Sequence, residues 1–345
     1  MRRITIEREI LPSRRTLVAV ALFSLALVAV AATPQLLGRQ VGRSFDGLEA
    51  AQPAWLWLAA TLFVGALLAN AFAWRAALRS VGACELTRAD SAARYCTGSL
   101  VNSLMPARIG DAVRLALYAR TLPTRDRLWT TGGVFAAIGA ARLLVLGVMV
   151  AIGAAIGALP LWPLALAGAL VGGGALLAYG SRGRALTGRA AHLLDAFRAL
   201  GRRPGRAAWI IAWLTVATAA RVGGASAIVA ALGVHAPFEA AIIVVAALDL
   251  AGILPLTPGN VGITSGAVMV ALQARGVGMT SALTTGIAMH AVETAAGIGC
   301  GSAGALLLAR FSSPRVRRWS LVAAGAAASL ALGMAFSATV LAPLV

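Results

Sequence analysis

Apolar residues occur along the chain in long runs, and arginine-rich polar segments separate these runs. A helix needs about 20 apolar residues to cross a hydrocarbon core about 30 Å thick. Seven runs come close to or exceed that length: residues 16–33, 54–74, 130–158, 161–180, 207–233, 279–309 and 319–343. Two further apolar regions, 89–121 and 238–275, are interrupted near the middle by proline and glycine, so that neither half can span alone. The pattern predicts an all-α polytopic membrane protein with about seven full crossings and two re-entrant helical hairpins.

The positions of the arginines predict an orientation, because positive charge gathers on the cytoplasmic side of a membrane protein. Arginines cluster before residue 16, on both sides of the first broken region, in the segment 181–206 and at 315–318, whereas the segment 34–53 is charge-balanced. These positions agree if the first hairpin enters from the cytoplasm and the second from outside. The N-terminus is then cytoplasmic and the C-terminus is outside.

Composition supports a membrane protein and argues against a soluble one. Of 345 residues, 59% are hydrophobic and only 12% are charged, against about 25% charged in soluble domains. The net charge of +18 would suggest nucleic acid in a soluble protein, but here the arginines lie between apolar runs, so we expect no nucleic-acid partner. We interpret the chain as a single multi-pass domain, 1–345, of a bacterial cytoplasmic membrane.

Two segments outside the main crossings have their own character. We interpret residues 16–53 as a retained N-terminal anchor helix followed by a loop. In 181–206, apolar residues share one helical face with arginines opposite, a pattern typical of a basic amphipathic helix on anionic headgroups. A solvated linker is the alternative.

The two broken regions resemble each other. Pro106 and Gly110 have the same spacing as Pro258 and Gly262, and the two prolines are 152 residues apart. The helices predicted to begin at 54 and 207 show nearly the same offset. We therefore expect two copies of helix, hairpin, helix, helix at 54–180 and 207–343, in opposite orientation, as in secondary transporters with inverted repeats.

The first break carries candidate ligands for a phosphate. Non-helical backbone at membrane depth is tolerated only beside protein or a water-filled cavity, and the N-terminus of the following half-helix favours an anion. Arg108 lies in the break and Arg114 just after it, with Asp111 between them to neutralise part of their charge. We expect these arginines to bind a lipid phosphate; a snorkelling arginine at the membrane surface is the alternative for Arg114.

Ionisable side chains also fall inside apolar crossings, where they are costly and commonly functional. They are Arg142, Arg221, Asp249, His290 and Glu293. The repeat offset places Glu293 opposite Arg142 and Arg221 opposite Asn70. An Arg142–Glu293 pair would be either a structural ion pair or part of a binding or gating site, and His290 either a proton relay or a packing residue.

The sequence shows no catalytic constellation, metal-ligand spacing or phosphate-binding loop, so we expect no cofactor, no metal and no enzyme activity. The cysteines, Cys84, Cys96 and Cys300, show no paired motif, and we interpret them as reduced, small apolar residues.

The motifs NSLMPARIGDAVR (102–114) and PLTPGNVGITSGA (255–267) resemble the lysylphosphatidylglycerol synthase transmembrane-domain family of flippase-like proteins. The matching positions are Asn102, Pro106, Arg108, Gly110, Asp111 and Arg114 in the first element, and Pro255, Pro258, Gly259 and Gly262 in the second. Asn260 stands where the family has glycine, and Ser265 where it has an acidic residue. Two further departures are Val145, where an aspartate is common, and His290, where an arginine is common. The resemblance thus implies a more cationic interior, and no aminoacyl-transferring domain is expected.

Together these observations predict a transporter that flips an anionic phospholipid or a polyprenyl-phosphate-linked lipid by alternating access. Its phosphate would lie between the hairpin tips, held by Arg108 with Arg142 or Arg221. Two alternatives remain: a membrane-embedded glycosyl or acyl transferase with Asp111 as its base, and a transporter of polar solutes.

Overall fold

A computed structural model describes residues 51–83, 85–105, 109–124, 126–157, 168, 204–251 and 263–311. The secondary structure assigned within these ranges is helical. The elements are α3 (Pro53–Ser80), α4 (Arg88–Leu104), α5 (Ile109–Ala119), α6 (Arg127–Ala155), α9 (Pro204–Ala231), α10 (Pro237–Ala251), α11 (Ile263–Gln273) and α12 (Met279–Phe311). The crossings predicted at 16–33, 161–180 and 319–343, and the amphipathic segment 181–206, lie outside the described residues.

Four of these helices are long and apolar enough to cross a membrane: Pro53–Ser80, Arg127–Ala155, Pro204–Ala231 and Met279–Ala309. Each contains or closely overlaps a crossing predicted from the apolar runs. Glycines with positive φ follow the ends of α6 and α9, at Gly157 and Gly233, a common way to terminate a helix because glycine adopts this conformation without steric cost. The chain is a multi-pass helical membrane protein.

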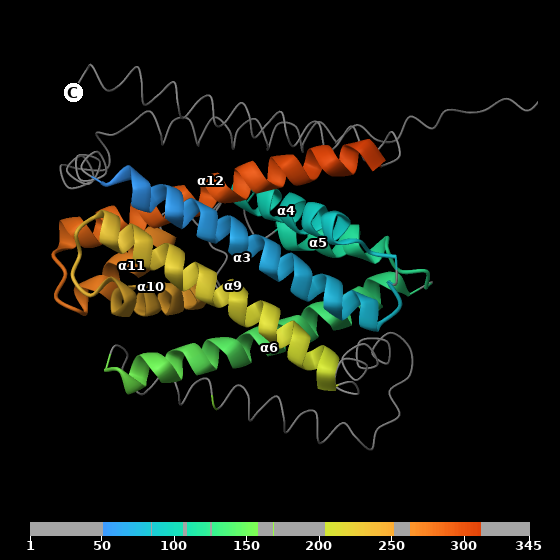
Figure 1. The fold of residues 1–345 in the computed structure, drawn as a ribbon, viewed down its shortest axis with the longest axis horizontal. Coiled ribbons are helices and arrows are strands. Elements are labelled where there is room, and N and C mark those ends of the chain that lie inside the picture. The colour runs from blue at the N-terminus through green and yellow to red at the C-terminus, as the bar shows by residue number, and fades with distance from the viewer. Residues whose placement is uncertain are drawn as a thin grey trace, which may run out of the picture.

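Helices α3 and α9 form an antiparallel pair through the middle of the molecule (Figure 1). At one end, the backbone N–H of Gln52 donates to the carbonyl of Ala231 over 3.3 Å. Further along, the rings of Phe72 and Trp213 meet edge to face with centroids 5.0 Å apart. Between these points Gly224 faces Phe63 so closely that an added Cβ would lie 3.0 Å from the ring. A larger residue at this position would require the Phe63 ring to shift.

The first predicted break is confirmed, because helix α4 ends at Leu104 and α5 begins at Ile109. The two helices pack antiparallel as a hairpin: Arg94 donates to the carbonyl of Leu117 over 2.6 Å. Ser91 lies 3.0 Å from the hydroxyl of Tyr118. Thr87 caps the start of α4 by accepting from the N–H of Asp90, which satisfies one of the free donors of the first turn.

The second broken region contributes two described helices, α10, which runs to Ala251, and α11, which begins at Ile263; the residues between them lie outside the described part of the chain. An ion pair of 2.8 Å joins Glu239, near the start of α10, to Arg275, just after α11. The two helices also contact each other. Because the ion pair joins the start of α10 to the end of α11, the helices run antiparallel as a second hairpin. The hairpins lie toward opposite ends of the view in Figure 1.

The two remaining long helices flank the central pair on opposite sides (Figure 1). Helix α12 packs against α4, α11 and α3, whereas α6 packs against α5, α10 and α9. Buried apolar side chains form two clusters, one including Trp74, Tyr118 and Val134 beside the first hairpin and the other including Val244 and Leu272 beside the second. Each hairpin thus has its own core, and the space between the hairpins is where a polar site can form.

Candidate functional site

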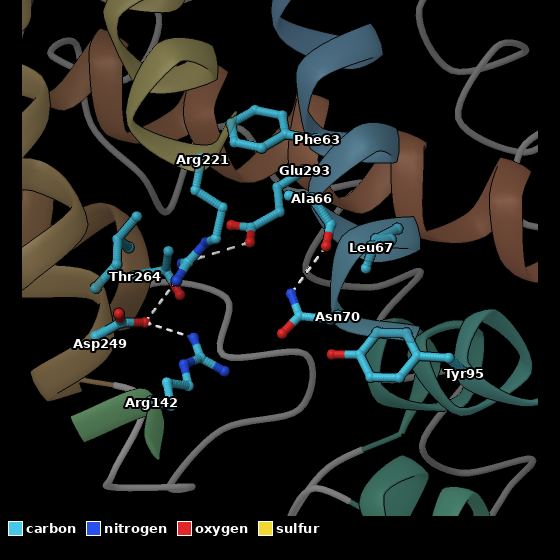
Figure 2. Close-up of a pocket in the computed structure, with 11 residues that line it drawn as sticks. Phe63, Ala66, Leu67, Asn70, Tyr95, Arg142, Arg221, Asp249, Thr264 and Glu293 are labelled. Carbon is cyan, nitrogen blue, oxygen red and sulfur yellow. Dashed lines mark hydrogen bonds and ion pairs between the residues drawn. The ribbon is translucent and has the colours of Figure 1, made fainter. Parts of the chain in front are cut away.

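A cavity of about 230 Å³ lies where the central helix pair meets both hairpins (Figure 2). Its wall contains both charged or polar and apolar side chains. The lining residues are Phe63, Ala66, Leu67, Asn70, Tyr95, Arg142, Arg221, Leu248, Asp249, Thr264 and Glu293. Helices α3, α4, α6, α9, α10, α11 and α12 each contribute to this set. The cavity is therefore sensitive to the relative position of nearly every described helix.

Four charged side chains in the cavity wall form one connected network, which we call the ion network. Asp249 accepts from Arg221 over 2.6 Å and from Arg142 over 2.9 Å. The second terminal nitrogen of Arg221 lies 3.7 Å from a carboxylate oxygen of Glu293. Figure 2 shows the three side chains Arg142, Asp249 and Arg221 converging from different helices.

The ion network contains two positive and two negative charges, so its formal charge is zero. Asp249, one of the ionisable residues expected inside the apolar crossings, supplies the carboxylate that both arginines share. This contact changes the pairing predicted from the repeat offset: the ion-pair partner of Arg142 is Asp249, and Glu293 lies beside Arg221 instead. The offset brought the right residues to one cavity, but it did not determine which ones touch.

Exposure differs sharply along the ion network. The side chains of Arg221 and Asp249 are only 15% and 14% exposed, whereas that of Arg142 is 46% exposed and that of Glu293 is 40% exposed. The central pair is therefore the most buried part of the network, and its short contact offsets part of the desolvation cost of the two charges. The outer members, Arg142 and Glu293, present one positive and one negative group to whatever enters the cavity.

Two uncharged polar residues complete the cavity wall. Asn70 on α3 donates from its amide to the carbonyl of Ala66 over 2.8 Å, which fixes the side chain against its own helix. Tyr95 on α4 directs its hydroxyl toward the cavity (Figure 2). Tyr95 could not be predicted as a site residue, because a tyrosine in the helix before the break carries no distinguishing pattern in the sequence.

Arg114 faces the inside of the first hairpin and is not available at a membrane surface. Its side chain is 10% exposed and pairs with Asp111 over 2.7 Å. It also donates to the hydroxyl of Ser99 over 3.1 Å, and its guanidinium lies 4.0 Å from the centre of the Tyr95 ring, a cation–π contact. Arg114 therefore stabilises the hairpin, and the alternative of a snorkelling surface arginine is wrong.

Asp111 is engaged by the same group of residues. Besides Arg114, the amide of Asn102 donates to its carboxylate over 3.1 Å. Gly110 lies against the opposite helix, where an added Cβ would collide with the carbonyl of Gly98 and the side chain of Asn102. The motif residues Asn102, Gly110, Asp111 and Arg114 thus form one contact cluster between α4 and α5, which gives the motif a structural role in the hairpin.

The remaining predicted site residues are not all brought to the cavity. Pro106, Arg108, Pro258, Gly259, Asn260 and Gly262 lie outside the described residues. His290 is half-buried on α12, one turn before Glu293, and is not part of the cavity lining. Within the part of the chain that the structure describes, no group of three or more histidine, cysteine, aspartate or glutamate residues could hold a metal ion. The charged and polar side chains that line the cavity can form ion pairs and hydrogen bonds with a ligand.

Comparison with known protein families gives one match. The family described as the lysylphosphatidylglycerol synthase TM region matches residues 16–301. The comparison with curated proteins gave no match. The matched segment includes the central helix pair, both hairpins and all four members of the ion network, so the site belongs to the family region.

Proposed function

Because the chain belongs to the family of the lysylphosphatidylglycerol synthase transmembrane region, which indicates a membrane protein acting on lipids, we propose that it moves a lipid with a phosphate-bearing headgroup between leaflets. The substrate class is an anionic phospholipid or a polyprenyl-phosphate-linked lipid, in a bacterial cytoplasmic membrane with the N-terminus cytoplasmic. The observation that carries this proposal is the ion network in a cavity between two broken-helix hairpins. Charged groups inside apolar helices are costly to bury and commonly mark the pathway of a substrate.

We further propose that the described helices form two inverted repeats, α3–α6 and α9–α12. The helix contacts support this arrangement, because each contact has a counterpart when the two sets are exchanged. The contact of α3 with α4 corresponds to that of α9 with α10, and the contact of α5 with α6 to that of α11 with α12. Likewise, the contact of α12 with α4 corresponds to that of α6 with α10, and the contact of α6 with α9 to that of α12 with α3. The antiparallel pair α3 and α9 would then lie on the pseudo-two-fold axis.

The cavity would also lie near that axis, because residues that the repeat offset relates line it together. Asn70 and Arg221 are related by the repeat offset, as are Arg142 and Glu293, and all four line the cavity. Sites at the interface of inverted repeats are exposed alternately when one repeat rocks against the other. A headgroup in this cavity would therefore be accessible first from one leaflet and then from the other.

The sharing of Asp249 between two arginines gives a physical route for binding. When a phosphate takes the exposed guanidinium of Arg142, Asp249 keeps its shorter contact with Arg221, 2.6 Å, so that no buried carboxylate loses all its partners. Leaving a buried charge unpaired costs about 3–5 kcal/mol. The ion network thus lets Arg142 exchange its protein partner for a ligand without that penalty, while the acyl or polyprenyl tail stays in the lipid.

We propose transport in preference to lipid glycosyl or acyl transfer. The transferase alternative needs an available base at the first break, and Asp111 is engaged by both Arg114 and Asn102. A transferase would lose product formation in an Asp111→Asn variant that remains folded. Under the proposed function, this variant affects chiefly the stability of the hairpin.

The test is lipid translocation by the purified full chain in vesicles. Fluorescent analogues with several phosphate-bearing headgroups are placed in both leaflets, and an impermeant quencher reports how fast inner-leaflet probe reaches the outside. We expect vesicles that contain the protein to expose inner-leaflet probe faster than protein-free vesicles for at least one headgroup. If vesicles with and without protein show equal rates for every headgroup, the proposed function is contradicted.

A further inference from the structure

Two cysteines that the sequence shows as isolated lie in contact between the first hairpin and α12. The Sγ atoms of Cys96 on α4 and Cys300 on α12 are 2.8 Å apart, and both cysteines are free thiols. Both are reduced, as the sequence predicts, but their contact could not be predicted from it. Residues 204 positions apart carry no local signal that they will meet.

The backbones of α4 and α12 approach each other closely around the two cysteines. Three glycines of α12 face α4, and a Cβ added to any of them would be obstructed. At Gly301 it would lie 2.7 Å from the carbonyl oxygen of Cys96, at Gly304 3.2 Å from the Cβ of Cys96, and at Gly297 2.8 Å from the hydroxyl of Ser103. Small residues about one helical turn apart allow this close packing of membrane helices. A disulfide requires Cα atoms about 4.4–6.8 Å apart, and the packing of glycine against the opposite backbone brings the two helices toward that separation.

We propose that Cys96 and Cys300 form a redox-active pair, whose oxidation to a disulfide fixes the first hairpin to α12. Two S–H bonds break and one S–S bond forms, and two electrons and two protons pass to an oxidant such as a disulfide or a diazene. Cys300 is the more accessible thiol, since Cys96 is only 1% exposed. The oxidant therefore reacts first at Cys300, and Cys96 then displaces it by attack on that sulfur.

The position of the pair connects it to the cavity. Tyr95, the residue before Cys96, lines the cavity and contacts Arg114. Glu293 lies on α12 seven residues before Cys300, about 10 Å along the helix. The disulfide would therefore tie together two helices that each contribute a side chain to the cavity wall. If translocation requires these helices to move relative to each other, oxidation stops it; this consequence rests on the proposed function.

The test uses the full chain with Cys84→Ser, so that only the pair remains among the three cysteines of the sequence. The protein is treated with diamide, a diazene, and free thiols are alkylated before peptide mass spectrometry. We expect a linked peptide joining Cys96 to Cys300, and a higher apparent unfolding temperature that returns to its starting value after reduction with dithiothreitol. The Cys96→Ser and Cys300→Ser variants should show neither change. Absence of the linked peptide in the folded protein would overturn the proposal.

Translocation is measured on the same samples. We expect oxidation of the Cys84→Ser protein to reduce its translocation rate by about tenfold or more, equivalent to about 1.4 kcal/mol in the barrier, with recovery on reduction. An unchanged rate in fully linked protein would overturn the claim that the disulfide stops transport. If the reduced protein shows no translocation at all, the proposed function fails, whereas the linked peptide and the unfolding temperature still decide whether the redox pair exists.

Discussion

Replacing Asp249 by asparagine tests how much the fold depends on the ion network. Asp249 accepts from Arg221 over 2.6 Å and from Arg142 over 2.9 Å, and its side chain is only 14% exposed. The neutral amide would leave two adjacent guanidinium groups with Glu293 as the nearest remaining carboxylate, 3.7 Å from Arg221. Removing one partner from a buried ion pair costs about 3–5 kcal/mol. We therefore expect the apparent unfolding temperature to fall by roughly 5–15 °C.

The matched control is Glu239→Gln at the outer end of the second hairpin. Glu239 also forms an ion pair of 2.8 Å, but the side chains of Glu239 and Arg275 are 40% and 37% exposed. Such pairs are worth about 0–1 kcal/mol because solvent screens them. The assay is intrinsic tryptophan fluorescence during heating in detergent, which the 8 tryptophans of the chain make practicable.

A second variant distinguishes unpaired charge from general disruption. Adding Arg142→Gln to Asp249→Asn removes the cation that has lost its ion pair with Asp249, while Arg221 keeps Glu293 at 3.7 Å, so we expect part of the lost stability to return. The reasoning is refuted if Asp249→Asn destabilises no more than Glu239→Gln. It is equally refuted if the second substitution adds a further loss of stability.

Three further variants test the first hairpin and the cavity wall. Gly110→Ala should lower the free energy of unfolding by about 1–3 kcal/mol, because the added Cβ has no space between the hairpin helices. The control is Gly139→Ala on α6, where nothing lies within 4 Å of an added Cβ. Equal unfolding temperatures for the two variants would contradict this packing. Arg114→Lys should lower the unfolding temperature, since lysine has no planar guanidinium to bond to Asp111 and Ser99 and to stack on Tyr95. A variant with unchanged stability but weakened lipid binding would instead favour the phosphate role predicted from the motif. Tyr95→Phe keeps that stacking and removes the hydroxyl that faces the cavity, so it should fold normally and slow translocation several-fold, about 1 kcal/mol in the barrier. A normal rate would show that the hydroxyl does not contact the substrate.

Much of the described fold could be predicted from the sequence, because membrane helices are determined by long-range features of composition. Apolar runs located the long helices, and Pro106 located the first break, since proline cannot donate a helical hydrogen bond. Gly110, which the sequence placed at the break, lies within α5. The ion-pair partners could not be predicted in the same way. Which of two carboxylates contacts Arg142 depends on the rotation and depth of separate helices, and neither leaves a periodic signal in the chain.

In the first hairpin, the sequence likewise predicted the positions of polar side chains but not their partners. The spacing of Asp111 and Arg114 correctly placed them one helical turn apart, but not the direction in which they point. Arg114 turns inward because Ser99 and the Tyr95 ring of the preceding helix offer a hydrogen-bond acceptor and a π face. These partners come from tertiary packing. A functional interpretation based on the motif alone therefore assigned Arg114 to a ligand, whereas the structure uses it within the protein.

The most direct measurement of the proposed function compares lipid translocation by the wild-type chain, Arg142→Gln and Arg275→Gln in vesicles at equal protein density. Arg142 is the exposed cation of the ion network, and Arg275 is an exposed paired cation outside the central cavity. Loss of one charge-assisted hydrogen bond, about 1.5–3 kcal/mol, should slow Arg142→Gln by about tenfold to a hundredfold and leave Arg275→Gln close to wild type. Wild-type rates in a folded Arg142→Gln variant would contradict a role for the ion network in transport.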